Sequence, residues 1–185
     1  MNTKPDPPAP LELIADGLCL RPWQHGDVAA LHEAVSESVA SVGRWLPWCH
    51  ADYGSADAAA WIVHCRWAWH SGEQFAFGIF DTASGVLLGG GGLSQRNRLQ
   101  RSANLGYWVR QSRQRQGIAA KAAICVARFG FEQCELTRIE LIVLPDNLAS
   151  RRTAEKVGAK FEGIAPRRLL ERDAAVYSLE PDDLR

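Results

Sequence analysis

The chain has 185 residues, of which 46% are hydrophobic and 23% charged, a composition typical of one globular domain with a buried core. Its 21 Lys and Arg residues balance its 21 Asp and Glu residues, and the net charge of zero removes the electrostatic argument for a nucleic-acid partner or a membrane surface. The longest segment without a charge, residues 82–95, is far shorter than the roughly 20 apolar residues of a membrane-spanning helix.

The N-terminal segment and the cysteines bear on the domain organisation and the cellular location of the protein. Residues 1–10 contain four prolines and lack the apolar core of a signal peptide, so we expect a flexible leader there. No linker or repeat interrupts residues 11–185, which predict a single domain. The cysteines are odd in number and form no CxxC pair, which favours reduced thiols and a cytoplasmic location. They are Cys19, Cys49, Cys65, Cys125 and Cys134.

Hydrophobic periodicity and turn residues divide the domain into short strands and helices. We expect Asp27 to cap the first helix, Ser55 or Asp57 to cap the second, and Gly158 to end the last. Strands are predicted over 18–23, 75–81, 86–94, 103–110, 138–144, 160–163 and 174–180, and helices over 28–38, 55–71, 118–134 and 148–157. This order predicts an α/β (α+β) fold, with a mixed central sheet and helices on both faces.

Several common motifs are absent. The sequence lacks the signatures of phosphate-loop proteins, dinucleotide-binding proteins, zinc proteases and serine hydrolases. The glycine run at 89–92 lies inside an apolar strand with no helix after it, which favours a bulge or close main-chain packing over a phosphate cradle. His64 and His70 share a helix, but a separation of six residues puts them on opposite faces, so we predict no metal site.

The basic stretch after the strand at 103–110 predicts an anion site. A short loop containing Gln114 and Gly117 leads into a helix, and its small residues allow close approach to the main chain. The unpaired N–H groups and the dipole at a helix N-terminus suit a pyrophosphate. Arg113, Arg115 and Lys121 add positive charge. Taken alone, the same stretch is equally consistent with an ordinary basic turn between a strand and a helix.

A second element follows at a fitting distance: the strand at 138–144, a turn with Asn147, and a short helix with Ser150. The two elements together resemble the GNAT superfamily of acyl-CoA-dependent N-acetyltransferases, and more narrowly its RimJ/RimL branch of ribosomal-protein N-terminal acetyltransferases. The resemblance covers residues 11–180. Its motifs are L-R-P-W at 20–23, W-L-P-W at 45–48, L-G-Y-W at 105–108, Q-x-x-G-x-A at 114–119, D-N-x-x-S at 146–150, E-G at 162–163 and D-x-x-x-Y at 173–177.

The resemblance implies acetyl-CoA as co-substrate. It implies a mostly antiparallel sheet whose strands at 103–110 and 138–144 splay apart around the pantetheine arm. The main chain of Trp108 and Val109 would pair with the arm, and Asn147 would bind it from the other wall. The pyrophosphate would lie on the main-chain amides that follow Gln114. These belong to Arg115, Gln116, Gly117, Ile118, Ala119, Ala120 and Lys121.

The resemblance also implies roles for two residues of the short helix after Asn147. Ser150 falls near the thioester sulfur of this branch, where its hydroxyl would donate to the departing thiolate; a helix-surface serine bonded to the preceding turn is the alternative. Arg152 would meet a phosphate of CoA or point to solvent.

The sequence departs from the family at its acid–base positions. Asn104 stands where many members carry a glutamate, Ala154 where others carry a tyrosine, and Leu169 where the ribosomal branch carries its base. We count Leu169 in a shortened loop. Glu171 and Glu140 are alternative bases, and the general base stays unassigned. Asn104, acting through a water, remains a catalytic candidate beside Ser150.

The tryptophans have two interpretations. Trp45 and Trp48 lie in a loop near the family's acceptor site, where they either line the acceptor pocket or anchor the loop. Trp61, Trp67 and Trp69 share a helix and favour core and interface packing.

A basic loop also allows two interpretations. Its arginines favour a solvated loop, with an attraction site for an acidic acceptor as the alternative. They are Arg96, Arg98 and Arg101.

These patterns predict a cytoplasmic acetyl-CoA:amine N-acetyltransferase with no nucleic-acid or membrane partner. The missing base favours an α-amine as acceptor, at the N-terminus of a protein or peptide, because an α-amine is more often neutral at pH 7 than a lysine. A small-molecule amine as acceptor is one alternative. A catalytically weak CoA-binding regulatory protein is another, and a homodimer is left open.

Overall fold

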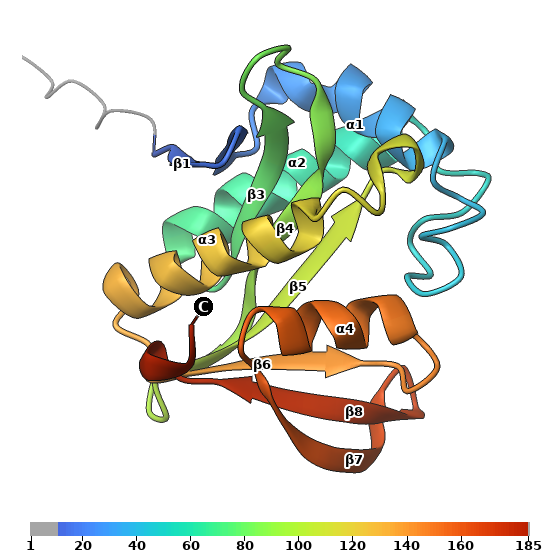
Figure 1. Ribbon diagram of the computed structural model, residues 1–185. Helices are drawn as coiled ribbons and strands as arrows, with labels where there is room; N and C mark the ends of the chain where they lie inside the picture. Colours follow the sequence, from blue (N-terminus) through green and yellow to red (C-terminus); the bar gives the residue numbers. More distant parts are fainter. Residues whose placement is uncertain (1–10, 185) are drawn as a thin grey trace, which may run out of the picture.

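The computed structural model describes residues 11–184, so the predicted leader at 1–10 lies outside the described residues. Within them, eight strands form one sheet in the order β1-β2-β3-β4-β5-β6-β8-β7, with four α-helices packed around it (Figure 1). The strands are β1 (Leu13–Ala15), β2 (Leu18–Pro22), β3 (Phe75–Asp81), β4 (Leu87–Asn97), β5 (Ser102–Val109), β6 (Arg138–Val143), β7 (Lys160–Leu169) and β8 (Arg172–Leu179). The helices are α1 (Val28–Ser36), α2 (Ser55–Ser71), α3 (Ile118–Glu132) and α4 (Leu148–Lys156).

The helices cover both faces of the sheet, as the sequence predicts. Helices α3 and α4 lie over one face, and the core there includes the fully buried Phe77 and Tyr177. Helices α1 and α2 lie over the other face, around Trp23 and Ile62. Every neighbouring pair of strands is antiparallel except β5 and β6. The prediction of a mixed, mostly antiparallel sheet is confirmed.

Strands β5 and β6 separate after a short contact. They pair only through Ser102, Ala103 and Asn104, whose last partner is Glu140. Beyond that point β5 continues along β4, while β6 continues along β8. The two strands therefore diverge like the arms of a V, which is visible in Figure 1, where the arrowheads of β5 and β6 point apart. This is the predicted splay.

The glycine run in β4 serves close packing. A side-chain carbon at Gly89 would collide with the main-chain oxygen of Trp108, and one at Gly92 would collide with the main-chain oxygen of Phe75. The pairing with β3 also shifts beside Gly89. The prediction of a bulge with close main-chain contact is confirmed.

Two predicted helix caps are wrong. Asp27 does not cap α1: its carboxylate accepts a hydrogen bond from the main-chain nitrogen of Gln24 at 2.8 Å and pairs with Arg21 at 2.7 Å, which secures the turn before the helix. Helix α2 begins after Gly54, whose N–H donates to the Asp57 carboxylate at 2.8 Å. Asp57 thus stabilises the helix start from inside the first turn.

Strand β1 was not predicted, and β7 is much longer than its predicted range of 160–163. Strand β1 is an addition at the sheet edge, where it pairs with β2. Strand β7 runs on to Leu169, where Leu170 and Glu171 turn the chain with φ of 51° and 56°. The predicted shortened loop around Leu169 is therefore a tight hairpin, and its two positive φ values were not readable from a Leu-Glu pair.

The tryptophans of α2 divide between core and surface. Trp69 packs on Phe75 and Phe77, each with ring centroids 5.0 Å away, so its predicted core position is confirmed. Trp61 and Trp67 are 39% and 59% exposed, so neither belongs to the core, and interface packing stays a prediction for both. No helix between residues 11 and 184 has the length and hydropathy needed to cross a membrane.

Candidate functional site

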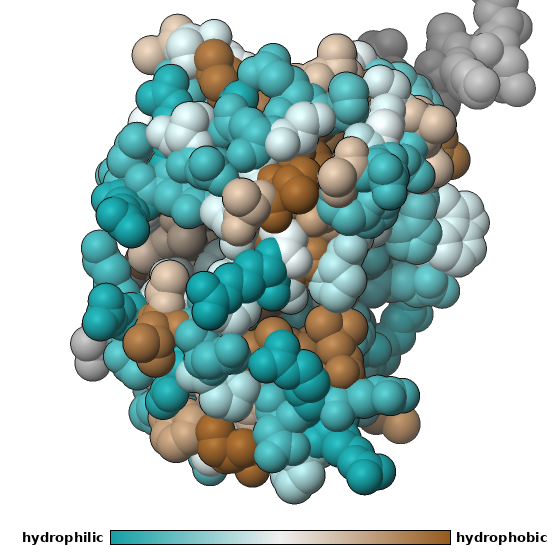
Figure 2. All heavy atoms as spheres, turned by 90° about the vertical axis from the view of Figure 1, so that its right-hand side faces the viewer, coloured by the Kyte–Doolittle hydropathy of each residue, from teal (hydrophilic) through white to brown (hydrophobic). Residues whose placement is uncertain are grey.

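A cavity of about 1110 Å³ lies where β5 and β6 diverge and continues towards the loop that joins α1 to α2. Figure 2 views the molecule from the side on which the two strands have separated in Figure 1, and hydrophobic residues reach the surface there between hydrophilic ones. Most of the predicted site residues meet at this cavity. They are Trp45, Trp48, Asn104, Trp108, Val109, Gln114, Arg115, Gly117, Ile118, Ala119, Ala120, Asn147, Ser150 and Arg152. Gln116 and Lys121 are not among its lining residues.

The N-terminus of α3 opens into the cavity. Gly117 precedes the helix with a left-handed φ of 76°, and a side-chain carbon there would first meet the Lys156 ammonium at 4.0 Å. The N–H of Lys121 already donates to the carbonyl of Gly117 at 3.2 Å, so the free N–H groups of this helix are the ones before it. The predicted anion site is therefore one residue too long at its end. The Lys121 ammonium donates instead to the carbonyl of Asp16 at 3.3 Å.

Basic side chains from two segments line the same cavity. Arg113 and Arg115 come from the loop before α3, and Arg152 and Lys156 come from α4. Among the described residues, the cavity lining contains no aspartate or glutamate. Free helix N–H groups, a left-handed glycine and four cations form a donor set that fits a pyrophosphate and further phosphate groups.

The loop before α3 is held by a buried arginine. Arg110, 6% exposed, donates to the Glu37 carboxylate at 2.7 and 2.9 Å and to Glu33 at 2.7 Å. The hydrogen bonds from Arg110, helped by those from Ser112, lower the pKa of Glu37 from its ordinary value of 4.5 to about 2. These contacts tie the end of β5 to the end of α1.

Two further hydrogen bonds join the same segments. The N–H of Gln111 donates to the Ser38 hydroxyl at 3.0 Å. The side-chain amide of Gln114 donates to the Val109 carbonyl at 3.0 Å and to the Ser41 hydroxyl at 3.2 Å. Gln114 therefore positions the loop, and its side-chain nitrogen is already engaged within the protein.

Ser150 lies at the start of α4, which Asn147 caps. The Asn147 side-chain oxygen accepts the N–H of Ser150 at 3.2 Å. The Tyr107 hydroxyl lies 3.0 Å from the Ser150 hydroxyl and donates to the Ser150 carbonyl at 3.2 Å. Burial raises the pKa of Tyr107, so this hydroxyl stays protonated. The sequence did not single out Tyr107, whose place beside Ser150 depends on a contact between residues 43 positions apart.

The acid–base positions hold no free carboxylate. Asn104 lines the cavity, and its buried side-chain oxygen has no hydrogen-bond partner among the described residues. Ala154 is fully buried in the core. Glu140, one of the two alternative bases, is paired with Arg138 at 3.1 Å and Arg168 at 3.3 Å.

The other alternative base, Glu171, is exposed in the hairpin turn that follows Leu169. Neither Glu140 nor Glu171 lines the cavity, whereas Leu169 does. Across residues 11–184, no group of three or more His, Cys, Asp and Glu side chains could hold a metal ion.

Aromatic residues line the part of the cavity nearest to α1 and α2. Trp48 is 39% exposed and meets Trp108 edge to face, with ring centroids 5.5 Å apart. Tyr53 lies 6.3 Å from Trp48 on its other side. Trp45 also lines the cavity, and the Arg44 guanidinium covers its ring at 4.7 Å. Of the two interpretations of Trp45 and Trp48, lining a pocket fits the geometry.

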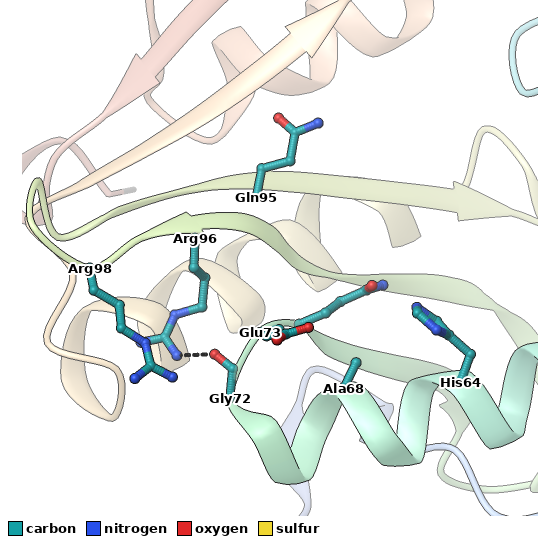
Figure 3. Close-up of a pocket in the computed structure, with 8 residues that line it drawn as sticks. His64, Ala68, Gly72, Glu73, Gln95, Arg96 and Arg98 are labelled. Carbon is teal, nitrogen blue, oxygen red and sulfur yellow. Dashed lines mark hydrogen bonds between the residues drawn. The ribbon is translucent and has the colours of Figure 1, made fainter.

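The arginines of the predicted basic loop are bound to main-chain carbonyls. Arg96 donates to Gly72 and Arg98 to Ser71 at the C-terminal end of α2, beside a small cavity of about 340 Å³ (Figure 3). Arg101 donates to Glu135 at 2.7 Å. Cations are favourable at a helix C-terminus. Arg98 and Arg101 are exposed, which confirms the predicted solvated loop, and Arg96 is half-buried; the hydrogen bonds anchor the loop to its neighbours.

Comparisons with known proteins agree with this geometry. The family model described as an acetyltransferase (GNAT) domain matches residues 17–160. The protein named "Probable N-acetyltransferase YjcK" of Bacillus subtilis (strain 168) is 36% identical over 118 residues, which cover 60% of this chain and 65% of that relative's length. The chain thus spans just under two thirds of that relative.

Solved structures are similar over most of the chain. Mycobacterium smegmatis RimJ in complex with CoA-disulfide is 26% identical, with a TM-score of 0.83 over 90% of this chain and 83% of that one. RimL, a ribosomal L7/L12 alpha-N-protein acetyltransferase in complex with coenzyme A, is 20% identical, with a TM-score of 0.84 over 94% of this chain and 99% of that one. The RimL structure is a likeness of fold.

Proposed function

Because this chain belongs to the GNAT family of acetyl-CoA-dependent N-acetyltransferases, we propose that its acceptor is the α-amine at the N-terminus of a peptide or protein. One observation carries the proposal: the cavity lining among the described residues contains four cations and no carboxylate. The acceptor must therefore supply a largely neutral amine by itself.

The ionisation of amines decides between acceptors. With a pKa of 7.7–8.0, roughly one α-amine in ten is neutral at pH 7. A lysine side chain, with a pKa near 10.4, is neutral in only about four molecules in ten thousand. A general base must make up that deficit of more than roughly 10²-fold, and the lining offers none among its described residues. An α-amine is consequently the better substrate for this site.

We assign acetyl-CoA to the part of the cavity that α3 and α4 line. The amides of residues 115–120 hold the pyrophosphate, and Arg152 with Lys156 binds a further phosphate. The main chain of Trp108 and Val109 offers the edge of β5 that β6 has left unpaired, which suits the amide groups of the pantetheine arm. Asn147 faces the arm from α4.

The transfer itself needs positioning and two protein groups. The neutral amine attacks the thioester carbonyl carbon, a C–N bond forms, the C–S bond breaks, and the sulfur leaves with the electron pair. The Ser150 hydroxyl donates a hydrogen bond to that sulfur as its charge develops. The unpartnered oxygen of Asn104 accepts a hydrogen bond from the amine or from a water beside it. The proton that the nitrogen loses as the amide forms passes to water, and the CoA thiolate takes up a proton from water as it leaves.

The free thiols support a cytoplasmic location for the reaction. All five cysteines are unpaired. Secreted proteins of this size with several cysteines usually pair them, so free thiols support a cytoplasmic site of action.

The decisive experiment compares two peptides of equal length. One has a free N-terminus and no lysine, and the other has a blocked N-terminus and one lysine. We expect thiol release from acetyl-CoA to be faster with the free N-terminus by at least about tenfold, with a rate that falls below about pH 8 as the acceptor ionises. Faster turnover of the blocked lysine peptide would falsify the proposal. Turnover of small amines alone would favour the small-molecule alternative.

A further inference from the structure

The cavity has a floor of distinct composition on the side of α1 and α2. Along β5, Tyr107 packs with the α3 core and Trp108 with the core around α1 and α2, so the even-numbered residues share the latter face. On that face Asn104 opposes Ser94, Gly106 opposes Gly92, and Trp108 opposes Gly90. A side-chain carbon built at Gly106 would meet no atom within 4 Å. The middle of the floor therefore borders open space.

Aromatic side chains surround this space. Trp48 stands edge-on against Trp108 at 5.5 Å, and Tyr53 stands against Trp48 at 6.3 Å. Trp61 lines the same cavity from α2, and Trp48 and Trp61 are each 39% exposed. Burial raises the pKa of Tyr53 to about 12, so its hydroxyl carries no charge at neutral pH. We call the space bounded by Trp48, Tyr53, Trp61 and Trp108 the aromatic compartment.

The polar groups beside the aromatic compartment are uncharged. They are the side chains of Gln74, Ser94 and Asn104, which line the cavity with no aspartate or glutamate among the described lining residues. A charged group entering the compartment would lose water, and none of the four residues that bound it carries a charge. The nearest charges, Asp57 beside Tyr53 and Arg44 over Trp45, are not among the lining residues. An aromatic ring would instead gain apolar contacts and edge-to-face packing.

We propose that the aromatic compartment binds the side chain next to the reacting amine, and that it selects a large apolar or aromatic first residue. This inference rests on the proposed function, which puts a peptide α-amine at Asn104, next to Gly106 on the same face of β5. From Gly106 to Trp108 the strand advances about 7 Å. A first side chain attached one carbon from the amine covers most of that distance if it is an aromatic ring such as Phe or Trp, and Leu covers part of it. Alanine is too short to contact the aromatic residues, and aspartate or lysine would bring its charge among uncharged side chains.

The test uses peptides that differ only in their first residue: Trp, Phe, Leu, Ala, Asp or Lys, each with a free N-terminus and no other lysine. We expect kcat/KM for Trp, Phe and Leu to exceed that for Ala by about tenfold or more, and to exceed the values for Asp and Lys by a larger factor. Equal kcat/KM across the series, or the highest value for Ala, Asp or Lys, would overturn the inference and leave the α-amine proposal standing.

Two tryptophan variants test whether the aromatic compartment causes the preference for a large apolar first residue. Trp48→Ala removes an exposed wall, and we expect it to lower kcat/KM for the Phe peptide by about tenfold. Trp67→Ala is the matched control, because Trp67 is 59% exposed on α2 and does not line the cavity. An unchanged preference in a folded Trp48→Ala protein would also overturn the inference.

A pair of small amines separates the inference from the proposed function. 2-Phenylethylamine carries an aromatic ring two carbons from its amine, and ethanolamine carries a hydroxyl at the same distance. If the protein acetylates phenylethylamine well ahead of ethanolamine and no peptide at all, the aromatic compartment is upheld and the peptide acceptor is wrong. If it acetylates no amine bearing an apolar group, the inference is overturned.

Discussion

The two halves of the cavity are built in different ways. The half facing α3 and α4 presents main-chain N–H groups and cations from two short segments, 113–120 and 147–156, beside the apolar residues 141–144 at the end of β6. The half facing α1 and α2 gathers side chains from the α1–α2 loop, α2, β4 and β5, and these are aromatic or uncharged. The first half suits a co-substrate that the whole family shares, because main-chain donors bind phosphate whatever the side chains are. The second suits an acceptor that differs between family members.

The largest expected effect comes from the first half, at its boundary with the second. Ser150→Ala should lower kcat by roughly 10²-fold or more, because a donor to developing charge acts mainly in the transition state. Acetyl-CoA binding should change little, since Ser150 contributes less to the ground state. Single-turnover kinetics and the acetyl-CoA Kd measure the two effects. Ser71→Ala is the control, since its hydroxyl bonds the Ala68 carbonyl at the far end of α2. A normal kcat in the Ser150 variant would reduce this serine to a surface residue.

Substitutions at two glycines, one in each half of the cavity, test the two halves separately. Gly117→Val puts a branched side chain at a φ of 76° in front of the α3 amides, so the variant should lose the stabilisation by acetyl-CoA, about 2.7 kcal/mol at 100 times the Kd. That corresponds to a rise in Tm of roughly 5–11 °C in the wild type.

Gly106→Val is its counterpart in the acceptor half. It has open space above it and no left-handed φ, so it should keep the acetyl-CoA shift. It should lose most acceptor turnover, because the new side chain fills the floor. Thermal shift and thiol release on both proteins test the division. The comparison fails if both variants lose the same property.

The contrast between the two halves also explains which features could be predicted from the sequence. Segments whose structure depends on near neighbours are predictable: the loop at 114–119, the cap at Asn147 and the stop at Gly158 combine local turn chemistry with helix periodicity. The order of the elements from β2 to β8 follows from the same local signals. The splay between β5 and β6 came from resemblance to the family and not from any pattern in the residues.

Features that depend on distant partners were not predictable. Arg110 and Glu37 are 73 positions apart, and neither carries a signal that it will meet the other. The hydroxyl of Tyr107 reaches Ser150 only because α4, which packs on α3, β6 and β7, brings its first turn beside β5. Trp61 and Trp67 share one helix with the buried Trp69, so composition alone could not separate the exposed rings from the core ring. The acceptor half consists almost entirely of such features.

Tyr107 offers a test of intermediate size. Tyr107→Phe removes one neutral hydrogen bond to Ser150, 3.0 Å long, and should lower kcat roughly 2- to 12-fold with little change in the KM for acetyl-CoA. Tyr177→Phe is the matched control. Its hydroxyl bonds Arg151 and Glu155 of the same helix but does not line the cavity, so that variant should lose stability and keep kcat. Equal losses of kcat in both would mean that Tyr107 acts only through the packing of α4.

The smallest effect is expected where the two halves are joined, at the ion pair between Glu37 and Arg110. Hydrogen bonds from Arg110 lower the pKa of Glu37 to about 2. The folded state therefore favours the ionised carboxylate, and its stabilisation is complete above about pH 5 and lost as the pH falls towards 2. Glu37→Gln should lower the Tm by a few degrees at pH 7, and the difference from wild type should shrink below pH 5.

Glu33→Gln provides the control for that ion pair. Glu33 bonds the same arginine at 2.7 Å, but its side chain is 71% exposed, against 29% for Glu37, so solvent screens its contribution. We expect little change in Tm for Glu33→Gln at any pH. Glu37 also adjoins Ser38, which holds the loop before α3, so Glu37→Gln should weaken acetyl-CoA binding slightly more than Glu33→Gln does. If the two variants lose equal Tm, or if the Glu37 difference persists unchanged at pH 3, the pair does not join the halves in the way that its geometry indicates.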